Sequence, residues 1–195
     1  MEYNKLRDQA YQIAVQHGFY QDGKSLNHYL AHVTAELGEA YNAHRQGWFP
    51  DLDRFTRLTK KPKSIRDWVW RLRRPDDDQR FYDAFEACIK DTVADELADA
   101  VLCLLSLSGH LGVDFDTVPD NEKYKRRFSR WSFAENKTAF EKNLLNDFYK
   151  LPSRMKFGID FLVEWSASMT FCLEDFIHLK MRYNKLRPMY NGKQY

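Results

Sequence analysis

Two short segments of the chain each carry a pair of carboxylates spaced three residues apart. The sequence ELGE contains Glu36 and Glu39, and the sequence ELAD contains Glu96 and Asp99. On an α-helix, residues three apart are neighbours on the surface. A rotation of about 100° per residue puts both pairs on the same rim of an apolar helix face. Packing of the two faces would therefore bring four acidic side chains together at the edge of a core.

The residues beside these carboxylates are small, which would let the two helices and a ligand approach closely: Gly38, Ala40, Ala98 and Ala100. Four clustered carboxylates repel one another unless a cation neutralises them. Oxygen-only ligands suit Mg²⁺, with Mn²⁺ as a substitute, rather than zinc. Mg²⁺ often completes its shell with phosphate oxygens, so the pattern indicates a phosphorylated ligand. The alternative interpretation is that both pairs are ordinary acidic residues on solvated helix faces.

ELGE followed by ELAD resembles the ExxE and ExxD metal-binding motifs of the all-α nucleoside triphosphate pyrophosphohydrolases, which are the MazG-like proteins and the related dimeric dUTPases. The resemblance covers mainly residues 25–47 and 81–112. It implies that all four carboxylates bind magnesium. It also implies that a (deoxy)nucleoside triphosphate is hydrolysed to monophosphate and pyrophosphate, with Glu36 or Glu39 activating the water. Two departures are Ala35, where the family often has a first Glu, and the long separation of the two motifs by residues 40–95.

The C-terminal segment carries a line of polar residues at helical spacing. Lys180, Asn184 and Arg187 follow an i, i+4, i+7 pattern, and Lys193 comes shortly after. This segment is similar to the N-x-x-R and Gly-x-Tyr-like tail of the dimeric dUTPases, and the similarity implies that these four residues hold the substrate phosphates. A cationic line suits a triphosphate. The alternative is a solvated helix end, where cations are favoured by the helix dipole.

Aromatic side chains near these segments are candidates for contact with a base. Trp48 follows the first carboxylate motif, and Tyr183 lies within the polar C-terminal segment. We expect one of them to stack on the base of a nucleotide. His44 is a weaker candidate and is interpreted as a residue of the helix surface.

The elements that must position these residues are helices, because apolar residues recur at helical spacing nearly throughout. Ser25 is a suitable N-cap, and Gly18 and Gly47 are suitable helix ends. No alternating strand pattern is present. The sequence predicts one all-α domain over residues 1–195, a helical bundle of about four to six helices with an insertion at about 48–80. The predicted helices are 3–17, 25–47, 81–111, 133–148 and 159–186. Within the insertion, one short amphipathic helix is expected around Trp68 and Trp70. The insertion is interpreted as a lid, a substrate-specific element, an oligomer contact or a surface excursion.

Composition limits the classes of protein that remain. The 195 residues carry a net charge of only +2, which disfavours a nucleic-acid-binding module despite the basic stretch at 60–74. Three scattered cysteines and the lack of an N-terminal signal pattern lead us to expect a cytoplasmic protein. The uncharged run at 100–113 is too short to cross a membrane. Family resemblance implies a homo-oligomer, a dimer or tetramer. The remaining alternative is a non-catalytic helical nucleotide-binding or scaffold protein with a degenerate site.

Overall fold

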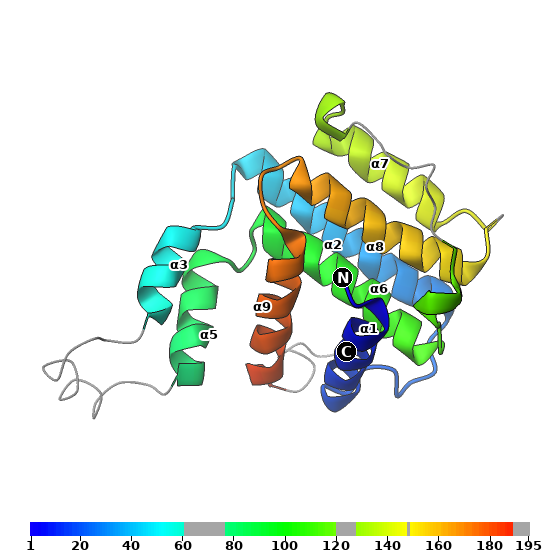
Figure 1. The fold of residues 1–195 in the computed structure, drawn as a ribbon, viewed down its shortest axis with the longest axis horizontal. Helices are drawn as coiled ribbons and strands as arrows, with labels where there is room; N and C mark the ends of the chain where they lie inside the picture. Colours follow the sequence, from blue (N-terminus) through cyan, green and yellow to red (C-terminus); the bar gives the residue numbers. More distant parts are fainter. Residues whose placement is uncertain (61–76, 120–127, 148, 189–195) are drawn as a thin grey trace, which may run out of the picture.

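The computed structural model describes residues 1–60, 77–119, 128–147 and 149–188, and within them it contains eight α-helices, two 3₁₀ helices and no strand (Figure 1). The all-α prediction is therefore confirmed for this part of the chain, although the helices are shorter and more numerous than predicted. Their bounds are α1 Tyr3–Gln16, α2 Leu26–Gln46, α3 Leu52–Thr59, α5 Asp77–Cys88, α6 Val93–His110, η1 Phe115–Thr117, η3 Phe128–Arg130, α7 Phe133–Leu144, α8 Leu151–Ala167 and α9 Leu173–Leu186.

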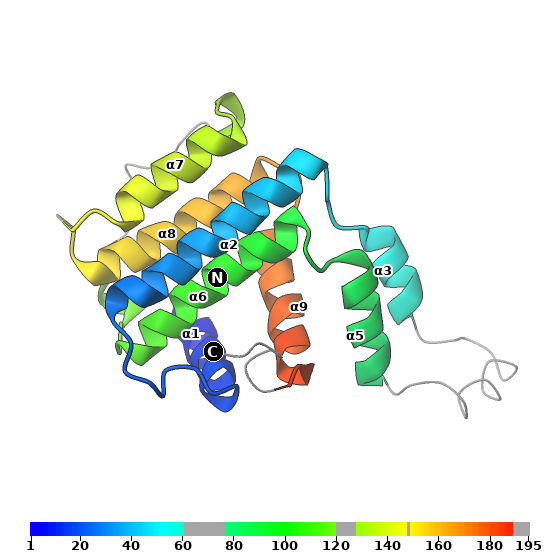
Figure 2. The ribbon, with the colours of Figure 1, turned by 180° about the vertical axis from the view of Figure 1, so that it is seen from behind.

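The core is built around α6, most of whose residues are buried and which contacts α1, α2, α8 and α9. Both ribbon views show α2 alongside α6, with α8 and α7 beyond them on one side and α1 and α9 on the other (Figures 1 and 2). Leu37 of α2 and Leu97 and Leu104 of α6 are fully buried. Burial of each such side chain contributes about 1.5–3 kcal/mol, which is why the two helices hold a fixed register.

Helices α2 and α6 run antiparallel. Tyr29 near the start of α2 lies beside His110 at the end of α6, with ring centroids 5.9 Å apart. Glu39, in the second half of α2, lies close to Glu96 at the start of α6. The predicted ends of α2 are confirmed, because the Ser25 hydroxyl accepts a hydrogen bond from the His28 amide and Gly47 has a φ of 72°.

The predicted helix at 81–111 is wrong in one respect: it is two helices, α5 and α6, separated by a turn at 89–92. Asp91 adopts a left-handed φ of 60°, and Thr92 caps α6 by accepting from the Asp95 amide. A carboxylate oxygen of Asp95 also accepts from the Asp91 amide at 3.0 Å. Apolar residues continue on both sides of the turn, Ile89 before it and Val93 after it, so the periodicity alone does not reveal the break.

The predicted helix at 159–186 is also two helices, α8 and α9. Thr170, with a φ of 70°, lies in the turn between them. Helix α8 begins earlier than predicted, at Leu151, with Pro152 in its first turn, where a missing amide costs nothing. The predicted helix at 133–148 ends at Leu144 as α7. Shorter helices allow α9 to cross α6 at a new angle, and this crossing brings Lys180 to the carboxylates.

The predicted insertion at 48–80 contains α3 and the start of α5, and the short helix expected around Trp68 and Trp70 lies outside the described residues. Helices α3 and α5 pack together through Phe55 and Phe81, whose ring centroids are 5.8 Å apart. Two backbone hydrogen bonds join the ends of this segment, from Asp51 N to Cys88 O and from Val93 N to Trp48 O, both at 3.0 Å.

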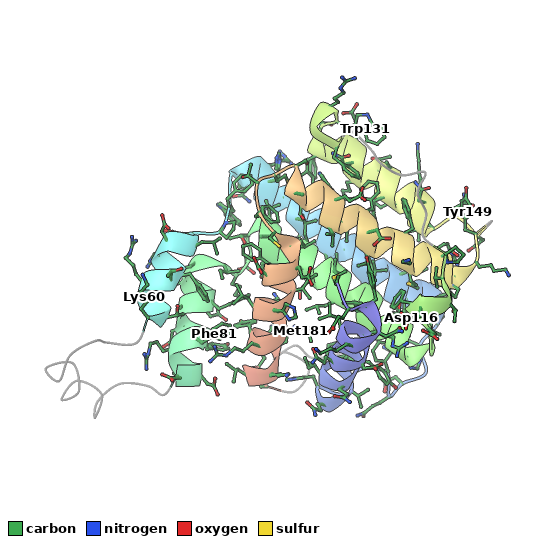
Figure 3. The ribbon with its side chains drawn as sticks, in the orientation of Figure 1. Lys60, Phe81, Asp116, Trp131, Tyr149 and Met181 are labelled. Carbon is green, nitrogen blue, oxygen red and sulfur yellow. The ribbon has the colours of Figure 1, made fainter. Side chains whose placement is uncertain are left out.

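Side chains of α9 occupy the space between α5 and α1, where Figure 3 labels Phe81 and Met181. The guanidinium of Arg182 lies 4.1 Å from the Phe81 ring centroid, and Met181 is buried. Among the described helices, none combines the length and the apolar character that a membrane span requires.

Candidate metal and ligand site

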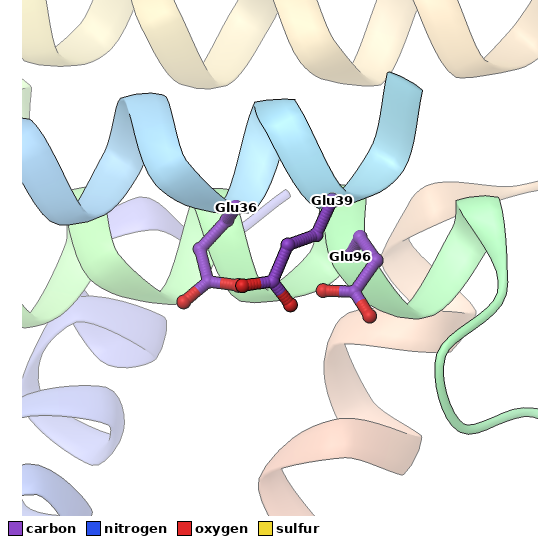
Figure 4. A group of neighbouring side chains, drawn as sticks. All are labelled: Glu36, Glu39 and Glu96. Carbon is purple, nitrogen blue, oxygen red and sulfur yellow. The ribbon is translucent and has the colours of Figure 1, made fainter. Parts of the chain in front are cut away.

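Three of the four predicted ligands converge where α2 passes the start of α6 (Figure 4). One carboxylate oxygen from each of Glu36, Glu39 and Glu96 lies within 4.8 Å of the others. Glu39 is exposed, Glu36 is half-buried, and Glu96 is only 4% exposed. The backbone around them is fixed by the buried apolar face of each helix. All three donors are oxygens, which is the donor set that suits Mg²⁺ or Mn²⁺.

The fourth predicted ligand, Asp99, is engaged by a lysine. The Lys180 ammonium lies 2.8 Å from Asp99 Oδ2 and 2.7 Å from Asp95 Oδ1. Lys180 is 3% exposed and Asp95 is 1% exposed. We expected Lys180 to hold phosphate, but its charge is directed to these two carboxylates. Burial lowers the pKa of Lys180, but Asp99 and Asp95 outweigh that effect and the net shift is upward, so the lysine stays charged.

The carboxylates on α6 are in an unfavourable electrostatic environment. Burial, followed by repulsion from Asp99 and Asp95, raises the pKa of Glu96 to about 9, although Lys180 opposes the shift. Burial also raises the pKa of Asp95 to about 6, with Lys180 opposing. Lys180 therefore does not neutralise the whole group, and a bound divalent cation would relieve the remaining repulsion.

The carboxylates line one part of a cavity of about 350 Å³ that is bounded by α1, α2, α6 and α9 and by the segment between α1 and α2. The lining includes residues 28, 32, 36 and 39 of α2 and residues 96, 99, 103 and 106 of α6, together with Tyr29, Asp95 and Leu102 beside them. Successive residues in each set of four are three or four positions apart, so each set lies along one helix face. Because the helices are antiparallel, one half of the cavity is acidic and the other half carries histidine, tyrosine, cysteine and serine.

The second half of the cavity is aromatic. Tyr20 stacks on His110 with ring centroids 4.6 Å apart and lies 4.8 Å from Tyr29, while its hydroxyl is 2.8 Å from the Ser106 hydroxyl. Burial raises the pKa of Tyr20, which keeps the phenol neutral. Two buried polar atoms that belong to cavity-lining residues, Tyr29 Oη and Asn184 Oδ1, have no hydrogen-bond partner among the described residues. Such atoms are costly unless a ligand or water satisfies them.

The other predicted site residues fall in different places. Asn184 and Arg187 line the cavity, as a phosphate-binding role requires. Lys193 lies outside the described residues. Trp48 is 47% exposed and does not line the cavity.

Tyr183 corrects our expectation of base stacking. Its ring stacks on Phe85 at 4.3 Å and on Tyr82 at 5.0 Å, and its hydroxyl donates to Glu86. The side chain is only 1% exposed, so it is enclosed by protein groups and offers no open surface to a base. It is a packing residue of α9 that helps to fix Lys180, whose ammonium lies 5.5 Å from the Tyr183 ring centroid.

Several residues of the cavity were not singled out from the sequence. Asp95 directly precedes ELAD, and the spacing of Asp91, Asp95 and Asp99 by four was a readable signal. His28 and His32 continue the line of Glu36 along α2, also in steps of four. Lys90 is near these acids in the sequence, but only the turn at 89–92 places it in the cavity wall.

Comparisons of the chain with protein-family models, with curated proteins and with solved structures found no match. The resemblance to the pyrophosphohydrolases therefore rests on the motifs and their spacing.

Proposed function

We propose that this protein is a magnesium-dependent hydrolase that cleaves a nucleoside triphosphate between the α and β phosphates, releasing monophosphate and pyrophosphate. The observation that carries the proposal is the convergence of Glu36, Glu39 and Glu96 within 4.8 Å at the wall of a cavity. The site of cleavage follows from the likeness of ELGE and ELAD to the family motifs.

The donor set fits a hard divalent cation. The cluster and its neighbours contain six carboxyl groups, and Lys180 supplies one ammonium to two of them. The six are Glu36, Glu39, Asp91, Asp95, Glu96 and Asp99. A cation held by oxygens and bound to phosphate would offset this excess of negative charge, whereas phosphate alone would be repelled. When bound, Mg²⁺ would stabilise the charge that develops on the phosphate oxygens.

The protein's own residues have separable tasks in this proposal. Glu36 and Glu39 lie on the accessible side of the cluster, where a carboxylate orients or deprotonates an attacking water. Asn184 of α9 and Arg187, which follows α9, line the cavity. Lys90 lines it from the turn before α6, with its ammonium 2.9 Å from a partly exposed carboxylate, that of Glu86. These three would hold the phosphates through charged and amide hydrogen bonds.

The aromatic half of the cavity supports a nucleoside as the remainder of the substrate. His28 lies eight residues before Glu36 on α2, which is about 12 Å along the helix axis. Tyr20 and Tyr29 provide flat apolar surface there, and within the described part of the chain Tyr29 Oη and Asn184 Oδ1 have no hydrogen-bond partner. A small number of polar groups in a mostly apolar pocket is typical of ligand sites.

The test is release of pyrophosphate from a panel of ribo- and deoxyribonucleoside triphosphates, with Mg²⁺ and with chelator. We expect Mg²⁺-dependent release, with monophosphate as co-product, that Glu39→Gln lowers by about 10²-fold or more. Glu164→Gln is the matched control, because Glu164 is an exposed helical glutamate outside the cavity. Nucleotide binding without hydrolysis of any substrate would favour the non-catalytic alternative. Equal activity of both variants would contradict the assignment of the site.

A further inference from the structure

The two histidines of the cavity face each other. His28 Nε2 and His32 Nε2 are 3.2 Å apart, and their rings lie at 79° to each other with centroids 4.8 Å apart. Both side chains are half-buried, and both line the cavity. Direct hydrogen bonding between the rings needs one Nε2 to carry a proton and the other to accept it.

Two imidazoles bound to one metal ion would have nearly the same separation as these two rings. Zinc binds imidazole nitrogen at about 2.0–2.1 Å, so two nitrogens 3.2 Å apart would subtend an angle of about 100° at a shared ion, close to the tetrahedral value. Other first-row ions with an affinity for imidazole have similar needs. Each ring would then carry its proton on Nδ1, leaving both Nε2 lone pairs for the metal.

The helix holds the two rings in position before any ion binds. Residues at i and i+4 are neighbours on a helix face, and the backbone amide of His28 donates to the Ser25 cap. The His28 ring makes a T-shaped contact with the Tyr29 ring, with centroids 5.5 Å apart. A pair of ligands fixed in this way loses little freedom on binding.

We propose that His28 and His32 form a second cation site, one that takes imidazole-preferring transition ions such as Zn²⁺, Ni²⁺ or Co²⁺ rather than Mg²⁺. It lies about one helical turn, or about 6 Å along the axis, from Glu36. Water would complete the coordination on the side open to the cavity. One cavity therefore carries two positions of different chemistry, an oxygen site at one end and a nitrogen site beside it.

The test is a titration of the tag-free chain with Co²⁺ in excess Mg²⁺, followed by visible absorption and calorimetry. We expect binding of Co²⁺ that His28→Ala and His32→Ala each weaken by about tenfold or more. His178→Ala, which alters an exposed histidine of α9 outside the cavity, is expected to leave the affinity unchanged. Glu39→Gln is also expected to leave it unchanged, because the carboxylates are a separate site.

Three outcomes would overturn the assignment: no binding of Co²⁺, equal affinity in the wild type and both alanine variants, or loss of binding in Glu39→Gln. The last would place the ion on the carboxylates. Thermal unfolding of each variant shows whether it is folded, and the conservative changes His28→Gln and His32→Gln repeat the test with side chains of similar size. Because the readout is metal binding, the result stands whether or not the protein hydrolyses nucleotides.

Discussion

The two carboxylate motifs have the same spacing but different surroundings. On α2, Glu36 is half-buried and Glu39 is exposed, so water solvates these charges directly. On α6, Glu96 is buried and Asp99 is held by Lys180 together with the buried Asp95. Solvated carboxylates cost the fold little, whereas buried ones destabilise it unless they are paired or protonated. The α2 pair is therefore suited to exchange ligands, and the α6 group supplies a fixed negative field.

The largest expected difference concerns Lys180, the only ammonium that the structure places against the α6 carboxylates within the described residues. Lys180→Met removes this cation and leaves Asp95 buried without it, and we expect the free energy of unfolding to fall by about 3–5 kcal/mol. Chemical denaturation at neutral pH measures the change. Lys185→Met, at an exposed position of the same helix, is the control, with an expected change within about 0.5 kcal/mol.

A double variant separates pairing from packing. Lys180→Met combined with Asp95→Asn removes both charges, so it should recover much of the stability that Lys180→Met loses. Lack of recovery would mean that the aliphatic stem of Lys180, not its charge, is what matters in this part of α6.

A smaller effect on stability is expected from Glu96, and it depends on pH. The unfolded chain releases this proton near pH 4.5, but the folded protein keeps it to about pH 9. Between these values the unfolded state binds fewer protons, so the stability of the metal-free protein falls as pH rises. The pKa of Asp95 is raised only to about 6. Most of the stability lost above pH 6 therefore results from Glu96. Between pH 6 and pH 8, the free energy of unfolding of Glu96→Gln should rise relative to that of the wild type by about 1–2 kcal/mol.

Denaturation curves at several pH values measure this slope. Glu164→Gln, at an exposed glutamate of α8 outside the cavity, provides the comparison and should leave the slope close to that of the wild type. A wild-type stability that rises from pH 6 to pH 8 without metal would contradict the environment that we assign to Glu96. Addition of Mg²⁺ should flatten the wild-type slope, because the ion favours the ionised carboxylate.

The smallest effect on the metal-free fold is expected at Glu39. Glu39→Gln should change the stability by no more than about 0.5 kcal/mol, since the side chain is exposed. Its effect should appear only with metal: Mg²⁺ raises the melting temperature of the wild type by mass action and raises that of the variant much less. Differential scanning calorimetry with and without Mg²⁺ tests both parts. An equal response to Mg²⁺ in the two proteins would remove Glu39 from the metal site.

The sequence predicted the helical class and the convergence of four carboxylates, because both follow from periodicity and apolar faces. Three of the four, Glu36, Glu39 and Glu96, lie together, and Asp99 is paired with Lys180 instead. The start of α2 at the Ser25 cap and its end at Gly47 were also predictable from local chemistry. The turn at 89–92 was not, because apolar residues flank it and the helix is interrupted by the left-handed backbone of Asp91 and the extended backbone of Thr92. The pairing of Lys180 with Asp95 joins residues 85 positions apart and depends on how α9 crosses α6. The burial of Tyr183 has the same origin.

The backbone hydrogen bonds Asp51–Cys88 and Val93–Trp48 affect how easily the chain between them can change in length. The segment from α3 to α5 leaves the bundle and returns to it at one point, so its ends are already joined. Closing a longer loop costs only about 0.6 kcal/mol for each doubling of its length. Residues can therefore be gained or lost between Asp51 and Cys88 while the two hydrogen bonds keep Glu39 and Glu96 at the same separation.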